Sequence, residues 1–167
     1  MSFSILIVDD QEAFAQQIRV RLEREGYEAE VGSRKDDILR LLRERRFNLV
    51  ISDMKMPQMD GLELLGVVKE KYPDTAFIMM TAFGSVETAV DAMKRGANDY
   101  ITKPFPPEEL LLTIKNVLEK QSLLHEIKVL RKDVERRYSF GNFIGKSPRM
   151  QEVYDLISDV AETDATV

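Results

Sequence analysis

Near its start the sequence reads Ile5-Leu6-Ile7-Val8-Asp9-Asp10, an apolar run that stops at two adjacent carboxylates. A short run of β-branched and aliphatic residues with polar flanks is typical of a buried β-strand. The whole apolar stretch, residues 3–8, is too short for a signal peptide and far too short to span a membrane. We therefore expect a buried first strand, then a polar loop, in a cytoplasmic protein.

Similar apolar runs recur along the chain and predict further buried strands. We expect strands at residues 49–51, 76–80 and 99–102, and an edge strand at residues 27–31, where apolar and acidic residues alternate. Between the strands, apolar residues recur at helical spacing, as in Phe14, Ile18 and Leu22. Alternating strands and helices indicate βαβ units, so the fold class is α/β with a doubly wound parallel sheet in residues 1–120.

Polar residues stand where the predicted strands end: Asp9, Asp10, Asp53, Thr81 and Lys103. The carboxyl ends of parallel strands meet at one edge of the sheet, so these residues are expected to share a pocket. Three neighbouring carboxylates repel one another, and one lysine compensates them only in part. A hard divalent cation such as Mg²⁺ is the natural remedy. Asp53, central among the strands, is the candidate nucleophile for an aspartyl phosphate.

Each of these residues has an ordinary structural explanation when taken alone. Asp10 could cap a helix that starts near Gln11. Thr81 could satisfy a local backbone group, and Lys103 could be a plain surface residue. Their joint position at the ends of the strands favours the functional interpretation.

The same residues resemble the signature of response-regulator receiver domains: Asp9-Asp10, residues 53–57 with Gly61, Thr81-Ala82, and Lys103-Pro104-Phe105. The resemblance covers residues 3 to about 120. It implies a flavodoxin-like fold with five parallel strands in the order 2-1-3-4-5. It also implies that a sensor histidine kinase phosphorylates Asp53.

Receiver resemblance further assigns roles within the pocket. The implied Mg²⁺ ligands are Asp9, Asp10, Asp53 and the carbonyl of Lys55. Lys103 would contact the phosphoryl oxygens, ahead of a cis Lys103–Pro104 bond. Thr81 and Tyr100 would form a switch pair, in which the hydroxyl moves toward the phosphate and the ring turns inward. Ala82 leaves the pocket open to a phosphoryl donor, and the Lys55 side chain projects beside the phosphoryl site.

The last helix of the receiver, which begins after Pro106-Pro107, continues beyond the domain. Its apolar residues follow spacings of 4, 3 and 4 in Leu123, Ile127, Leu130 and Val134. This heptad pattern predicts a coiled-coil linker over residues 121–138 and a homodimer. A solvated linker helix is the alternative.

Residues 139–167 contain a segment that could be mistaken for a phosphate-binding loop. Only three residues separate Gly141 from Gly145, whereas a P-loop needs four. Residues 143–147, Met150 and residues 161–167 instead resemble the entrance to the AAA+ domain of sigma-54-dependent activators of the NtrC family. We therefore expect a linker and the truncated edge of an AAA+ domain, without ATPase activity.

Composition and motif order bear on the competing functions. The net charge of −5 argues against direct nucleic-acid binding, and the absence of cysteine excludes thiolate sites. A receiver with another output remains an alternative. An aspartyl-phosphate phosphohydrolase is less favoured because such enzymes carry Asp-x-Asp, and a nucleotide-binding protein would need a Gly-rich turn after the first strand. The chain is thus expected to be a switch, not an enzyme that turns over substrate.

Overall fold

A computed structural model describes the backbone of residues 3–82 and 86–138 and the side chains of residues 3–82 and 87–132. Five strands alternate with five helices in these ranges. The strands are β1 (Ser4–Val8), β2 (Glu28–Gly32), β3 (Leu49–Asp53), β4 (Ala76–Thr81) and β5 (Asp99–Thr102). The helices are α1 (Glu12–Arg24), α2 (Lys35–Glu44), α3 (Gly61–Lys71), α4 (Val86–Lys94) and α5 (Pro107–Tyr138). The expected edge strand lies one residue later than its alternating pattern indicated.

All strand pairs are parallel, and the order in the sheet is β2-β1-β3-β4-β5. The fold class and strand order expected from the sequence are therefore confirmed. β3 lies at the centre, with Ile51 paired to Ile7 of β1 and to Ile78 of β4. This central position brings the last residue of β3, Asp53, between the ends of β1 and β4.

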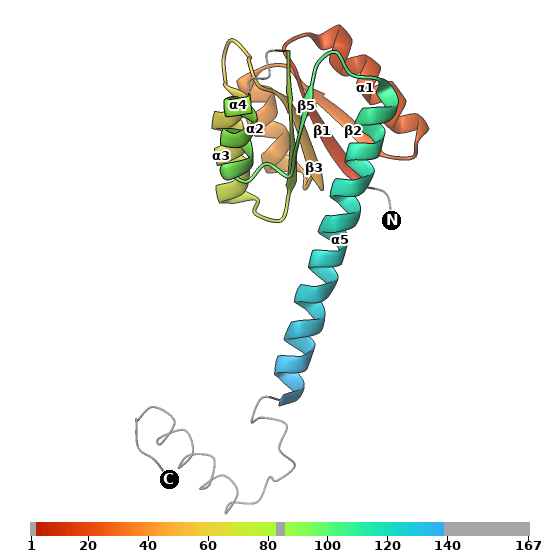
Figure 1. The fold of residues 1–167 in the computed structure, drawn as a ribbon, viewed down its shortest axis with the longest axis vertical. Helices are drawn as coiled ribbons and strands as arrows, with labels where there is room; N and C mark the ends of the chain where they lie inside the picture. The colour runs from red at the N-terminus through yellow and green to blue at the C-terminus, as the bar shows by residue number, and fades with distance from the viewer. Residues whose placement is uncertain (1–2, 83–85, 139–167) are drawn as a thin grey trace, which may run out of the picture. The chain divides into compact units, whose positions relative to one another are not determined.

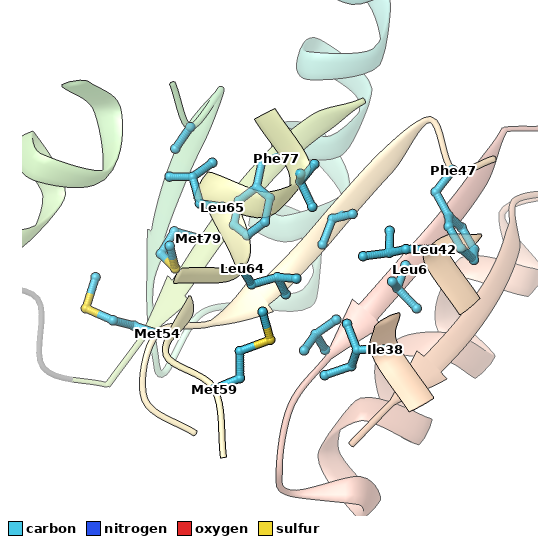
Figure 2. Close-up of a cluster of buried hydrophobic side chains, with 14 of the residues drawn as sticks. Leu6, Ile38, Leu42, Phe47, Met54, Met59, Leu64, Leu65, Phe77 and Met79 are labelled. Atoms are coloured by element: carbon cyan, nitrogen blue, oxygen red, sulfur yellow. The ribbon is translucent and has the colours of Figure 1, made fainter. Parts of the chain in front are cut away.

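Helices cover both faces of the sheet, with α2, α3 and α4 on one face and α1 and the start of α5 on the other (Figure 1). Alternate residues of a strand point to opposite faces, so Leu6 and Val8 belong to one core cluster and Ile5 and Ile7 to the other. Figure 2 shows the first cluster, where Leu64 and Leu65 of α3 meet side chains of the central strands. Burial of all of β3 and β4, and of β1 after Ser4, explains why these strands read as continuous apolar runs.

Glycines follow the carboxyl ends of two helices. Gly26 follows α1 with φ of 87° and Gly96 follows α4 with φ of 99°, a left-handed conformation that a side chain would disfavour. The amino end of α3 is capped by Asp60, whose carboxylate accepts the Leu62 backbone N–H at 2.8 Å. Capping fixes where α3 begins, immediately after the loop that follows Asp53.

Helix α5 packs on the sheet through Leu110, Ile114, Val117 and Leu118, all of them buried. By contacts, the chain divides into two units, residues 1–122 and 123–167. In the second unit Leu123, Ile127 and Leu130 are 60, 47 and 55% exposed. The Val134 side chain and the whole of residues 139–167, including the predicted AAA+ edge, lie outside the described residues. Among the described residues, no helix has the length and apolarity needed to cross a membrane.

Candidate functional site

The polar residues predicted to share a pocket do stand at one edge of the sheet. Asp9 directly follows β1, Asp53 and Thr81 are the last residues of β3 and β4, and Lys103 directly follows β5. These residues share one edge because all five strands are parallel, so their carboxyl ends lie at the same edge of the sheet.

Three carboxylates form a compact group at this edge. Asp9, Asp10 and Asp53 each offer an oxygen, and these oxygens lie within 4.8 Å of one another. Asp9 is fully buried and Asp53 nearly so, whereas Asp10 is exposed. The group is therefore anchored in the protein on one side and open to solvent on the other.

Lys103 is the cation of the pocket. Its Nζ lies 2.6 Å from Asp9 Oδ2 and 3.2 Å from Asp53 Oδ1, and its side chain is only 15% exposed. Its backbone N–H donates to the carbonyl of Thr81 at 2.7 Å, which fixes the start of the loop against β4. The Lys103–Pro104 peptide bond is cis, as the sequence comparison with receivers implied. One ammonium thus joins two of the three carboxylates.

The helix-capping role suggested for Asp10 is not what the structure shows. Helix α1 begins at Glu12, and Gln11, not Asp10, occupies its N-cap position without a side-chain capping hydrogen bond. Asp10 is exposed. Asp9 Oδ1 accepts the backbone N–H of Gln11 at 2.9 Å. Asp9 therefore combines a contact with the residue before α1 through Oδ1 with an ion pair through Oδ2.

Burial raises the pKa of Asp53 above its ordinary value. Lys103 opposes this rise through its charge and hydrogen bond, whereas the Asp9 carboxylate adds to it. Loss of hydration is the main cause because few water molecules reach a carboxylate at the end of the central strand. The ionised form of Asp53, which a nucleophile needs, is thus short of positive charge in the protein alone.

The arrangement fits a hard divalent cation. Carboxylate oxygens gathered on a partly solvated edge are the ligands that Mg²⁺ takes, together with water molecules. A single lysine leaves excess negative charge in the pocket, and a bound cation would neutralise it. The carbonyl of Lys55, the fourth ligand implied by resemblance, belongs to an exposed residue two positions after Asp53.

The predicted switch residues come from the two neighbouring strands β4 and β5, and Thr81 ends β4 at the edge that carries the carboxylates. Thr81 is buried, and Ala82 directly after it is exposed. Tyr100 in β5 packs inward against the core cluster that contains Ala92 and Ala97. The Tyr100 hydroxyl is buried and has no hydrogen-bond partner among the described residues.

Two aromatic residues complete the pocket, and sequence reasoning had given them no such role. The ring of Phe14 lies 4.6 Å from Lys103 Nζ, and it meets Phe105 edge-on with 6.1 Å between the centroids. The sequence signal for Phe14 was only its helical spacing, which indicated a core position. No pattern in the sequence indicated that its ring faces the lysine.

Comparison with known proteins identifies the class. The model of the response regulator receiver domain family matches residues 5–115. The chain therefore belongs to the receiver domain family of two-component response regulators.

The similarity extends beyond the receiver. Regulatory protein AtoC of Escherichia coli is 32% identical over 98% of this chain, which spans 35% of AtoC. The crystal structure of NtrX from Brucella abortus in complex with ADP superposes with a TM-score of 0.74 at 32% identity, covering 99% of this chain and 35% of NtrX. The solution structure of the beryllofluoride-activated NtrC4 receiver domain dimer matches 71% of this chain and 98% of its own, with 36% identity and a TM-score of 0.67. The relatives are thus NtrC-type regulators, and this chain spans about a third of AtoC and NtrX.

Proposed function

We propose that this receiver is a switch activated by phosphorylation of Asp53. The convergence of three carboxylates and one partly buried lysine at the carboxyl edge of the sheet carries the proposal. Asp53 is the acceptor because it ends the central strand, and Lys103 Nζ already lies 3.2 Å from its carboxylate. Asp10 is the exposed member and faces an incoming donor from solvent.

Phosphoryl transfer would proceed by attack of an Asp53 carboxylate oxygen on phosphorus. The new bond joins an Asp53 oxygen to phosphorus, and the bond between phosphorus and the donor atom breaks. In a phosphohistidine of a sensor kinase, that donor atom is a ring nitrogen, which keeps the electron pair. Lys103 would hold the phosphoryl oxygens with its ammonium. Asp9, Asp10, Asp53 and the Lys55 carbonyl would hold Mg²⁺, which would neutralise negative charge on the transferred phosphoryl group.

A small phosphodonor tests the acceptor. Incubation of the chain with phosphoramidate and Mg²⁺ should add one acid-labile phosphoryl group, visible by intact mass spectrometry. Asp53→Asn should abolish it, whereas Asp36→Asn, an exposed carboxylate in the first turn of α2, should not. A phosphoryl group on the Asp53→Asn protein would refute the assignment. Rapid release of many equivalents of phosphate would instead support the phosphohydrolase alternative.

The switch is proposed to couple Asp53 to α4 through Thr81 and Tyr100. Thr81 ends β4, the strand paired with the β3 strand that ends at Asp53. Thr81 is paired with Thr102 of β5, two residues after Tyr100 in the same strand. Movement of the Thr81 hydroxyl toward a phosphate would change the space beside the Tyr100 ring. In the Thr81→Val protein, Asp53 should still be phosphorylated, but the changes in α4 amide chemical shifts that phosphorylation causes in the unsubstituted chain should disappear from the NMR spectra. If phosphorylation changed the α4 shifts of this variant as much as those of the unsubstituted chain, the proposed coupling would be contradicted.

The exposed seam of α5 is proposed to form a parallel dimer. In heptad terms Ile127 occupies an a position and Leu123 and Leu130 occupy d positions. A β-branched residue at a with leucine at d favours two parallel strands. Glu126 then falls at g and Arg131 at the following e, the arrangement that allows an ion pair between two chains.

Sedimentation velocity with and without beryllofluoride tests the dimer. Ile127→Glu should weaken association, whereas Val129→Glu, on an exposed residue outside the seam, should not. Glu126→Arg should also weaken it, and adding Arg131→Glu in the same chain should restore it. The coiled-coil proposal would be refuted if the chain were a monomer both with and without beryllofluoride, or if Ile127→Glu and Val129→Glu had equal effects. Either result would favour a solvated linker helix.

We further propose that the output is a sigma-54-dependent activator of transcription with an AAA+ domain. The match along nearly the full chain to AtoC and to the ADP complex of NtrX supports this output. Reading the coding sequence beyond Val167 should reveal a Gly-rich Walker motif within roughly ten residues. A different domain there would favour a receiver with another output.

A further inference from the structure

The ring of Phe14 is in contact with the one lysine of the acidic pocket. Lys103 Nζ lies 4.6 Å from the ring centroid. Phe14 is half-buried on the sheet face that carries α1 and α5, and Phe105 braces it edge-on with an interplanar angle of 61°. The ring is therefore fixed between α1 and the loop that follows β5, close to the ammonium.

We propose that Phe14 is a positioning residue for phosphoryl transfer, which acts by holding the Lys103 ammonium at the acidic pocket through a cation–π contact. The inference rests on the proposed phosphorylation of Asp53. It concerns a residue outside the carboxylates and the lysine already assigned. The ring touches neither reactant, so its effect passes through Lys103.

The need for this contact follows from the other partners of Lys103. In the protein alone, the ammonium is held by Asp9 at 2.6 Å and Asp53 at 3.2 Å. A divalent cation on the same carboxylates neutralises part of their charge and weakens both ion pairs. The ring attracts the ammonium through its quadrupole and does not compete for the metal, so its attraction persists. Phe14 thus retains Lys103 when the ion pairs loosen.

Simple packing is the competing explanation, because Phe14 also covers part of the core. The two explanations differ in what can replace the ring. Leucine fills most of the space and keeps the apolar contact, but it has no π face. Tyrosine keeps the face. Only a cation–π role makes tyrosine an adequate substitute and leucine a poor one.

Rates of Asp53 phosphorylation by phosphoramidate at saturating Mg²⁺ separate these explanations. Phe14→Leu should lower the maximal rate by about 3- to 10-fold, the size that a partly desolvated cation–π contact supports. Phe14→Tyr should retain it. Phe3→Leu is the matched control, because Phe3 is a half-buried residue of the same core cluster that precedes β1 at the opposite edge of the sheet. The Mg²⁺ concentration for half-maximal rate should not rise in Phe14→Leu, since the ring contacts Lys103.

A second measurement works on the unsubstituted chain. Protons on the Lys103 ε-carbon should resonate upfield because of the Phe14 ring current, and they should stay upfield after addition of Mg²⁺ and beryllofluoride. An ordinary chemical shift in the presence of Mg²⁺ would overturn the inference, as would a Phe14→Leu protein that reacts at the normal rate or a Phe14→Tyr protein as slow as Phe14→Leu. Failure of the unsubstituted chain to accept phosphate on Asp53 would be a distinct result, and it would overturn the proposed function itself.

Discussion

Helix α3 contains two glycines for which the structure predicts opposite responses to alanine. At Gly61, the first residue of the helix, an added Cβ would lie 2.9 Å from Met54 Cα and 2.9 Å from Met79 Sδ, and would also press on the Asp53 carbonyl. At Gly66, in the middle of the helix, an added Cβ would meet nothing within 4 Å. One site is closed by backbone, and the other is open.

The expected free energies follow from these surroundings. Overpacking a buried position against backbone costs about 1–3 kcal/mol, because the end of β3 must move to accept the methyl group. An open glycine in a helix interior is less favourable than alanine by about 0.5–1 kcal/mol, so Gly66→Ala should stabilise the chain by that amount. For a domain of this size, about 1 kcal/mol shifts the Tm by about 3–5 °C. Gly61→Ala should therefore melt about 3–15 °C below the unsubstituted chain, and Gly66→Ala about 2–5 °C above it.

Thermal unfolding followed by far-ultraviolet circular dichroism measures both variants on the full chain. Gly61→Ala should also slow phosphorylation of Asp53, because the clash falls on the backbone of Asp53 and Met54. Gly66→Ala should react normally and thereby control for the loss of a glycine from α3. A Gly61→Ala protein as stable as Gly66→Ala would refute the close approach of α3 to the end of β3.

Three further outcomes are expected. Burial raises the folded-state pKa of Asp53 above its unfolded value, so the contribution of this carboxyl to stability falls as pH rises from about 3.8 through the folded pKa. Urea titrations should therefore show that Asp53→Asn is more stable than the unsubstituted chain at pH 7. This advantage should vanish at low pH, where Asp53 is protonated in both states. Thr75→Val should lose about 1–2 kcal/mol of unfolding free energy, since the buried Thr75 hydroxyl donates to the Phe47 carbonyl at 2.9 Å and valine leaves that oxygen unpaired; a neutral result would mean that the carbonyl finds another donor. Millimolar Mg²⁺ should raise the Tm of the unsubstituted chain but not of Asp9→Asn, and an equal rise in both would argue against Asp9 as a ligand.

Much of the fold was readable from local patterns. Continuous apolar runs marked β1, β3 and β4 because strands buried on both faces have no polar side. Helical spacing of apolar residues, as in Phe14, Ile18 and Leu22, marked α1, because one face of that helix packs on the sheet. The receiver signature then supplied the strand order, which periodicity alone does not contain.

The partners of the pocket residues were decided by tertiary structure. Asp9 accepts the backbone N–H of Gln11 just before α1, and the Phe14 ring meets Lys103, although Phe14 looked like an ordinary core residue in its own segment. A helical repeat tells which face of α1 is apolar, but not which side chain from a distant part of the chain meets that face. The raised pKa of Asp53 has the same origin, since its burial depends on neighbours from three strands and their loops.

The sequence by itself thus determined that Asp9 and Asp10 follow one buried strand and that Asp53 ends another, because hydrophobic burial and chain direction can be inferred from the local pattern. Only the tertiary structure decided how their charges are balanced. Lys103 bonds two of the three carboxylates and lies against an aromatic ring, because the order and register of a parallel sheet bring residues 94 positions apart to 2.6 Å.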